Sequence, residues 1–175
     1  TALAAVLADA QAQHVTEYWT VGDTTVRGPE PERCLRLLDQ VHPTAAVRGN
    51  HEENYQKVLN ANPETFTKPK QIMATILTHF DRQQLSPAHF KQLLDLPMIQ
   101  TKKVGPLTIR LQHVLPTVVS GHSLAPTESQ ANFDRAASGD PDIVIYAHTH
   151  QPIMRYSTNC QQPCALRYDN LRRCT

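Results

Sequence analysis

The residues from Gly49 to Glu52 combine side chains that can bind a metal ion and transfer a proton. The apolar run 45–47 before them is predicted to be part of a strand, and the composition turns helical from Glu52 onward. Asn50 and His51 are therefore expected at a strand-to-helix turn, where Gly49 gives the backbone freedom that a tight turn needs. Asn50 offers a neutral oxygen ligand, and Glu52 can orient the imidazole of His51.

Other residues that can bind a metal also follow predicted strands. They are Asp23 after the strand 18–21, His113 after 107–112, and His148 and His150 after 143–146. Open α/β sheets bind ligands beyond the carboxyl ends of their strands, so we expect these side chains to gather with Asn50 at one edge. Carboxylate, amide and imidazole donors together suit Mn, Fe, Zn, Ni or Co ions better than calcium. His122 competes with His113, but it lies in a loop, whereas His113 directly ends an alternating strand.

The rest of the pattern alternates helices with strands, as in a one-domain α/β protein. Helices are predicted at 2–13, 34–41 and 127–137, and further strands at 44–47, 98–103 and 152–156. Residues 55–95 are predicted to be a helical insertion over the sheet, punctuated by prolines. Its apolar residues form two stripes, both expected to contact the core: Ile72, Ile76, Leu77 and Phe80 in one, and Phe90, Leu93 and Leu94 in the other.

Length and charge narrow the class of protein. The chain has 175 residues and a formal net charge of +1, which allows one domain and gives no basic field for duplex nucleic acid. No run approaches the roughly 18 apolar residues of a membrane span, and no secretion signal is apparent, so we expect a cytoplasmic protein. Its four cysteines are then expected to be reduced. A zinc cluster of Cys160, Cys164 and Cys174 in the irregular tail 157–175 would lack a clear fourth ligand.

Taken in order, these donor blocks resemble those of the calcineurin-like metallophosphoesterases, particularly their small bacterial phosphodiesterase branch. The matching blocks are Gly22-Asp23, Gly49-Asn50-His51-Glu52, His113 and His148-Thr149-His150. The segment from Gly22 to Pro29 is also similar to that branch, and the resemblance continues to about Tyr156. It implies a four-layer α/β/β/α sandwich, in one metallophosphoesterase-like domain that spans residues 1–175.

The resemblance also implies a centre of two divalent transition-metal ions, with Mn favoured over Fe, Zn, Ni or Co. Asp23 would bridge the two ions. Asn50, His113 and His148 would complete one site, and His150 would contribute to the other. Two neighbouring cations can activate water and stabilise the entering and leaving oxygens of a phosphoester. The implied enzyme hydrolyses a phosphomonoester or phosphodiester in a phosphorylated small-molecule or nucleotide-like substrate.

The resemblance makes His51 and Glu52 the catalytic pair. His51, paired with Glu52, would protonate the departing oxygen or stabilise the charge that grows on it. Arg27 and Arg48 lie near the same predicted edge, where they are candidates to contact phosphate oxygens, although either can simply be a surface charge.

The chain departs from the family pattern in three places. The first block, Asp-x-His, is expected upstream of Thr1, because the first predicted helix begins almost at once. Ala147 stands where the family has glycine, and the tail lacks the Asn-Pro-Gly-Ser strand of that branch. These departures keep an alternative open: a catalytically impaired fragment or remnant of such an enzyme, with a binding or regulatory role.

Overall fold

A parallel pair of short strands forms the first of two sheets. The computed structural model describes residues 2–139 and 141–158. Strand β1 (Trp19–Thr20) lies parallel to β2 (Ala45–Ala46), with Trp19 opposite Ala45. Helix α1 (Ala2–Ala12) precedes β1, and α2 (Pro31–Val41), which starts at a proline, connects the two strands. Because the strands are parallel, the turns that follow them lie on the same side of the sheet.

The second sheet has the order β3-β4-β5. Strands β3 (Ile99–Val104) and β4 (Leu107–Gln112) form an antiparallel hairpin, whose turn places Gly105 at a φ of 57°. Strand β5 (Ile143–Ile145) pairs with β4 in parallel after helix α6 (Gln130–Ala136). The turns after β4 and β5 therefore also share one edge.

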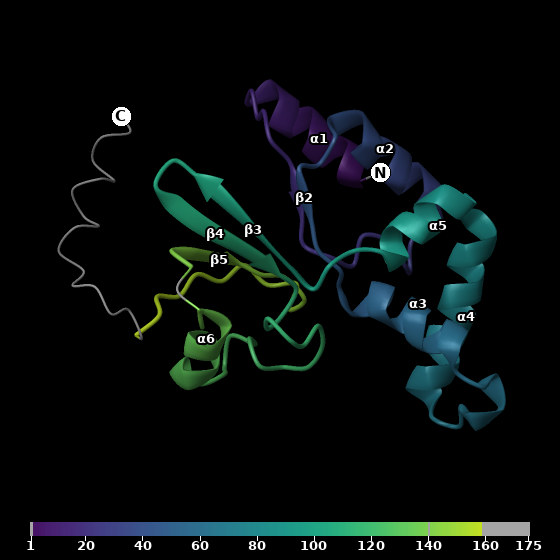
Figure 1. Cartoon of the computed structure of the whole chain (residues 1–175). Coiled ribbons are helices and arrows are strands. Elements are labelled where there is room, and N and C mark those ends of the chain that lie inside the picture. The colour runs from purple at the N-terminus through teal and green to yellow at the C-terminus, as the bar shows by residue number, and fades with distance from the viewer. Residues whose placement is uncertain (1, 140, 159–175) are drawn as a thin grey trace.

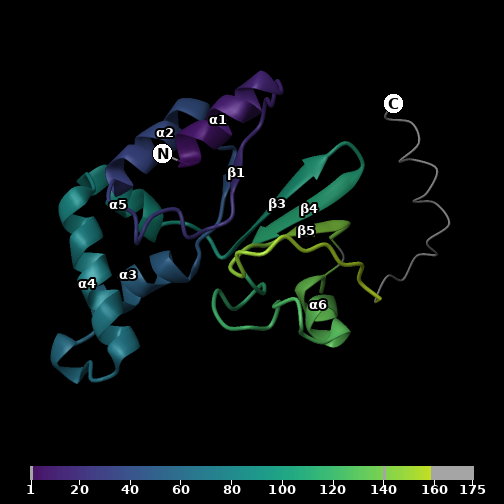
Figure 2. The ribbon, with the colours of Figure 1, turned by 180° about the vertical axis from the view of Figure 1, so that it is seen from behind.

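Buried apolar side chains from both sheets meet in one cluster. Ala45, Val47, Ile109 and Leu111 form it, with Trp19, Val21 and Ile145 packed against them. Figures 1 and 2 show α6 against the three-stranded sheet, while α1 to α5 gather beside the two-stranded sheet. This mixed α/β architecture with two sheets confirms the predicted fold class.

Three helices follow β2, as predicted for residues 55–95, although the first already starts at Asn50. They are α3 (Asn50–Asn60), α4 (Pro69–Gln84) and α5 (Pro87–Leu94), with a short 3-10 turn at Pro63–Thr65. Their common core joins Tyr55, Leu85, Phe90 and Leu93 to Leu35 of α2. The expected core stripe that includes Phe90 and Leu93 is therefore confirmed. Within the block α3 contacts both α4 and α5, and α4 also contacts α2 (Figure 1).

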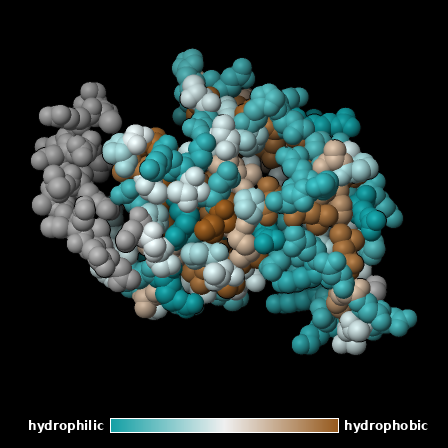
Figure 3. Space-filling view, in the orientation of Figure 1, coloured by the Kyte–Doolittle hydropathy of each residue, from teal (hydrophilic) through white to brown (hydrophobic). Residues whose placement is uncertain are grey.

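The other predicted stripe, on α4, does not contact the core. Ile72, Ile76 and Phe80 are 46%, 57% and 38% exposed, and hydrophobic residues appear along α4 at the surface in Figure 3. The side of α4 that faces the protein instead buries two polar residues, Thr78 and Asp81. The core assignment of this stripe was therefore wrong, because Asp81, which accepts hydrogen bonds from Tyr55 and Val26, faces inward in its place.

The predicted strand at 152–156 is also absent. These residues have no strand partner within the described chain, and Met154 and Tyr156 are about four-fifths exposed. Pro152 offers no N–H to a sheet, and Ile153 packs against the cluster around α6. Residues 159–175, which include the three tail cysteines, lie outside the described residues. None of the described helices is long and apolar enough to cross a membrane.

Candidate metal centre

Two glycines allow the turns after β1 and β2 to approach closely. Gly22 has a φ of 83°, and a Cβ there would lie 2.3 Å from the amide nitrogen of Gly49. A Cβ on Gly49 would lie 2.2 Å from Oδ1 of Asp23. Neither position has room for a side chain. The close approach places the Asp23 carboxylate directly at the start of α3.

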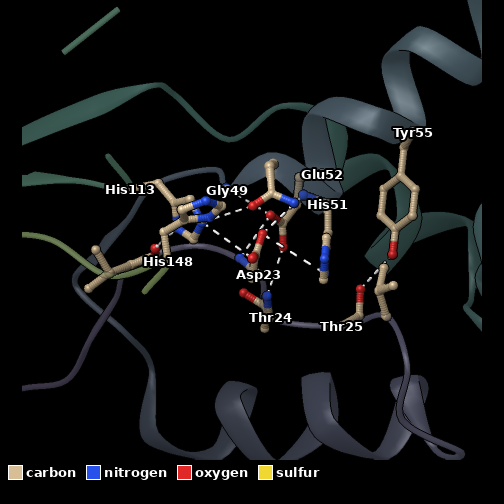
Figure 4. Close-up of polar contacts among 12 residues, drawn as sticks. Asp23, Thr24, Thr25, Gly49, His51, Glu52, Tyr55, His113 and His148 are labelled. Atoms are coloured by element: carbon tan, nitrogen blue, oxygen red, sulfur yellow. Dashed lines mark hydrogen bonds and ion pairs between the residues drawn. The ribbon is translucent and has the colours of Figure 1, made fainter. Parts of the chain in front are cut away.

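Glu52 joins these two turns through backbone contacts. Its side chain is buried, and Oε2 accepts hydrogen bonds from the amides of Asp23 (2.9 Å) and Gly49 (2.8 Å). Oε1 accepts a third from the amide of Thr24 at 2.8 Å (Figure 4). The expected pairing with His51 is not observed at Nδ1, because that nitrogen has no hydrogen-bond partner among the described residues. In this structure Glu52 instead holds the backbone around Asp23.

Asp23 lies between the turns and the histidines. Its Oδ1 accepts a hydrogen bond from the amide of His51 at 3.0 Å, and its Oδ2 lies 3.2 Å from Nε2 of His113. Burial disfavours the charged form, but the contacts with His113 and the His51 amide outweigh burial and lower the pKa of the Asp23 carboxyl. Asp23 is therefore an anionic side chain that already faces an imidazole, as a metal ligand would.

His113 ends β4 with its ring almost fully buried. Nδ1 lies 2.6 Å from the carbonyl oxygen of Val21, which can only accept, so Nδ1 carries the proton. Nε2 therefore points towards Asp23, Asn50 Oδ1 (3.3 Å) and His148 Nδ1 (3.3 Å). Burial opposes the shift, yet the contacts with Asp23 and Val21 raise the pKa of His113. A carbonyl that fixes the tautomer is a common support for a metal-binding histidine.

His148 reaches the same point from the turn after β5. Its ring meets that of His113 edge-on, with 5.1 Å between centroids. The amide of Ala147 donates to the carbonyl of His113 at 3.1 Å, and His148 itself has a φ of 71°. Burial and the neighbouring His113 lower the pKa of His148, which favours the neutral form that binds a metal.

This arrangement fits a divalent transition metal. One potential ligand atom each from Asp23, His113 and His148 lies within 4.8 Å of the others, and Asn50 adds an amide oxygen beside His113. The donors are nitrogen and oxygen atoms, and backbone groups orient them from behind. Four predicted ligands, each from the end of a different strand, therefore meet at one point.

The other predicted site residues lie around this cluster. His150 is exposed and outside the three-ligand group, although it lines a cavity of about 260 Å³ together with His148. Nδ1 of His51 is buried and lies 3.9 Å from Oδ1 of Asp23. Arg48 donates to Gln56 of α3 at 2.9 Å, and Arg27 is exposed.

The competing His122 also lies near the cluster. It is exposed, and its charge helps to lower the pKa of His148 after the larger effects of burial and His113. Only His113, however, is both buried and in the three-ligand group. The structure therefore places His113, and not His122, at the centre of the donors.

Comparisons with known proteins identify the family and support the fold. A family model described as calcineurin-like phosphoesterase matches residues 1–152. The crystal structure of the hypothetical protein PH1004 from Pyrococcus horikoshii OT3 is similar, with a TM-score of 0.64 and 13% sequence identity. The match covers 84% of this chain and 62% of that one, so the chain spans less than two thirds of its length. At this identity the likeness supports the fold alone. The match to the family model covers most of the sequence, and the chain belongs to the calcineurin-like phosphoesterase family.

Proposed function

We propose that this protein hydrolyses a phosphomonoester or phosphodiester with divalent metal ions, of which one is held by Asp23, Asn50, His113 and His148. Family membership supports a metal-dependent phosphoesterase in general terms. The observation that carries the proposal is the convergence of these donors from four strand ends, three of them within 4.8 Å of one another. When bound, the metal supplies the positive charge that activates water and stabilises a phosphoryl group.

His51 is the residue of this chain best placed to handle a proton. Its amide donates to Asp23, which fixes the residue beside the ligands, and its Nδ1 is buried without a partner among the described residues. A buried nitrogen without a partner is unfavourable unless a ligand satisfies it. We assign His51 to the departing oxygen of the substrate, as proton donor or as the group that stabilises its charge.

A second metal is proposed beside the first, with Asp23 as the shared ligand and His150 as a further donor. His148 and His150 line the same cavity, which supports a common role. Mn is the ion we favour from the family resemblance, and carboxylate, amide and imidazole donors are compatible with it as they are with Fe, Zn, Ni or Co. A phosphorylated small molecule or nucleotide is the proposed substrate class.

A binding role without turnover is the alternative function. It is favoured by one observation, that His150 is exposed and lies outside the ligand group of Asp23, His113 and His148. Without a second ion, the protein would bind a phosphorylated ligand and hydrolyse it poorly.

Hydrolysis of chromogenic phosphate mono- and diesters with added Mn²⁺ separates these two functions. His51→Ala should reduce the rate by about 10²- to 10⁴-fold while the metal content stays unchanged. His79→Ala is the matched control, because His79 is an exposed histidine on α4. An unchanged rate in His51→Ala would remove His51 from the mechanism, and a Mn²⁺-loaded protein that hydrolyses neither ester would favour the binding role.

A further inference from the structure

Helix α4 buries a carboxylate that its hydrophobic pattern does not explain. Asp81 is fully buried, and its Oδ2 accepts hydrogen bonds from the hydroxyl of Tyr55 and from the amide of Val26, the latter at 3.1 Å. Its Oδ1 is buried without a partner among the described residues. Burying a carboxylate with incomplete hydrogen bonding is unfavourable. The same orientation of α4 exposes Ile72 and Ile76 to solvent. The orientation is therefore unfavourable in two ways, because it buries a carboxylate and exposes apolar side chains.

Tyr55 extends the contact from α4 to the loop after β1. Its side chain is only 1% exposed, and its hydroxyl lies 2.7 Å from Oγ1 of Thr25. Because tyrosine has one hydroxyl proton and gives it to Asp81, Thr25 donates to Tyr55. Burial and Asp81 raise the pKa of Tyr55, which keeps it a protonated donor. Its ring packs against Phe90, with 5.3 Å between centroids.

The backbone that these residues hold is strained. Val26 has a φ of 71° and Arg27 one of 64°, in the left-handed region. A β-branched residue such as Val26 rarely adopts it and needs surroundings that enforce it. The amide of Val26 is the donor to Asp81. The contact with α4 therefore fixes the strained residue three positions after Asp23.

Carboxylates thus hold the loop 23–26 at both ends. Glu52 accepts the amides of Asp23 and Thr24, and Asp81 accepts that of Val26. Glu52 comes from the start of α3, whereas Asp81 comes from α4. Departures from the usual pattern of buried apolar and exposed polar residues are expected at functional sites. In α4 the departure is Asp81, the residue that contacts this loop.

We propose that Tyr55 and Asp81 are positioning residues of the metal centre, which fix the loop 23–26 so that the Asp23 carboxylate faces His113. The proposal rests on the proposed function only in that Asp23 holds a metal. It gives α4 a role beyond covering the core, because this helix sets the conformation of a loop that carries a ligand.

Metal affinity measures this role directly. Tyr55→Phe removes one hydroxyl and keeps the aromatic ring, and it should weaken Mn²⁺ binding about 10-fold or more in isothermal titration calorimetry. Asp81→Asn keeps an oxygen acceptor and should lose less affinity than Asp81→Ala. Phe90→Leu is the control, because it loosens the packing on Tyr55 without removing a hydrogen bond, and its Mn²⁺ affinity should stay near that of the unmodified protein.

A second measurement uses the unmodified protein and so does not depend on any variant folding. If the loop contact raises metal affinity about 10-fold, saturating Mn²⁺ must suppress opening of that contact by the same factor. The amide of Val26 should then exchange hydrogen about 10-fold more slowly with Mn²⁺ bound.

The outcomes separate this proposal from the proposed function. Equal Mn²⁺ affinity in Tyr55→Phe and the unmodified protein would overturn it, as would an equal loss in Phe90→Leu or a Val26 exchange rate that Mn²⁺ leaves unchanged. Failure to hydrolyse any ester, with Mn²⁺ binding weakened by Tyr55→Phe, would count against the proposed function alone. A protein that binds no Mn²⁺ would contradict both.

Discussion

Replacing Glu52 by glutamine tests whether this buried carboxylate holds the two turns of the metal centre. Its oxygens accept three backbone hydrogen bonds of 2.8 to 2.9 Å, from Asp23, Thr24 and Gly49. Glutamine has nearly the same shape but only one acceptor oxygen. If that oxygen takes the place of Oε2, the amide of Thr24 faces an NH₂ group and loses its acceptor.

The expected cost follows from those three contacts. A buried amide left without an acceptor costs about 1–3 kcal/mol, and two hydrogen bonds that lose their charged acceptor weaken by roughly 1 kcal/mol each. The sum is about 3–5 kcal/mol. Domains of this size are stable by about 5–15 kcal/mol, so the variant should lose a large share of its free energy of unfolding.

Urea unfolding followed by circular dichroism measures this loss, and a Mn²⁺ titration of the same samples reports on Asp23. The control is Glu53→Gln. It removes a helical ion pair with Lys57 at 3.2 Å and should cost about 0.3–0.5 kcal/mol. If Glu52→Gln is no more destabilising than Glu53→Gln, Glu52 does not hold the turns. Loss of hydrolysis with stability and Mn²⁺ affinity retained would instead return Glu52 to a catalytic role beside His51.

Two further changes test other parts of the structure. Gly49→Ala should destabilise the protein by about 1–3 kcal/mol and weaken Mn²⁺ binding, because the new Cβ would lie 2.2 Å from Oδ1 of Asp23. Gly28→Ala is its control, because a Cβ there would have nothing within 4 Å. Equal effects of the two substitutions in urea unfolding and Mn²⁺ titration would refute the close approach. The ring of His89 lies 2.8 Å from Glu32 and 2.8 Å from Asp39. The contact with Glu32, and then that with Asp39, raises the pKa of His89, although the partial burial of the ring opposes this shift. Its stabilisation is therefore present below about pH 6.5 and lost as the pH rises through the raised value, so urea unfolding should show His89→Gln to be about 0.2–1 kcal/mol more costly at pH 6 than at pH 9; a cost independent of pH would contradict the charged contact.

The meeting of the proposed metal ligands could be predicted because it depends on strand ends. Asp23, Asn50, His113 and His148 each follow a predicted strand, and β1 with β2, and β4 with β5, pair in parallel. Parallel pairing aligns the carboxyl ends of strands, so a local pattern is enough to bring these residues to one edge. His150 does not join them, because the turn after β5 leaves it exposed.

The supports of the site could not be predicted in this way. Asp81 accepts a hydrogen bond from the amide of Val26, which lies 55 positions away in the sequence, so no local pattern reveals the contact. Val21 supports His113 through its backbone carbonyl oxygen, a group that every residue has and that therefore gives no signal in the sequence. The apolar stripe of α4 even indicated the wrong inward side. Glu52 was predicted near the site as the partner of His51, but its three backbone partners became visible only in the folded chain.

One predicted strand, at 152–156, does not form. Residues 152–156 were predicted to be a strand, but a segment forms a strand only where a neighbour offers hydrogen bonds. Ile153 packs against the cluster around α6, whereas Met154 is 80% exposed. The strand prediction was therefore wrong, although one side chain of the segment, Ile153, is partly buried.

Anomalous diffraction from crystals of the protein grown with Mn²⁺ tests the central claim most directly. A peak bound by Asp23, Asn50, His113 and His148 together would establish the centre, and a second peak sharing Asp23 would establish the proposed pair of ions. A peak elsewhere, or none at saturating Mn²⁺, would contradict the metal centre and the hydrolytic function built on it.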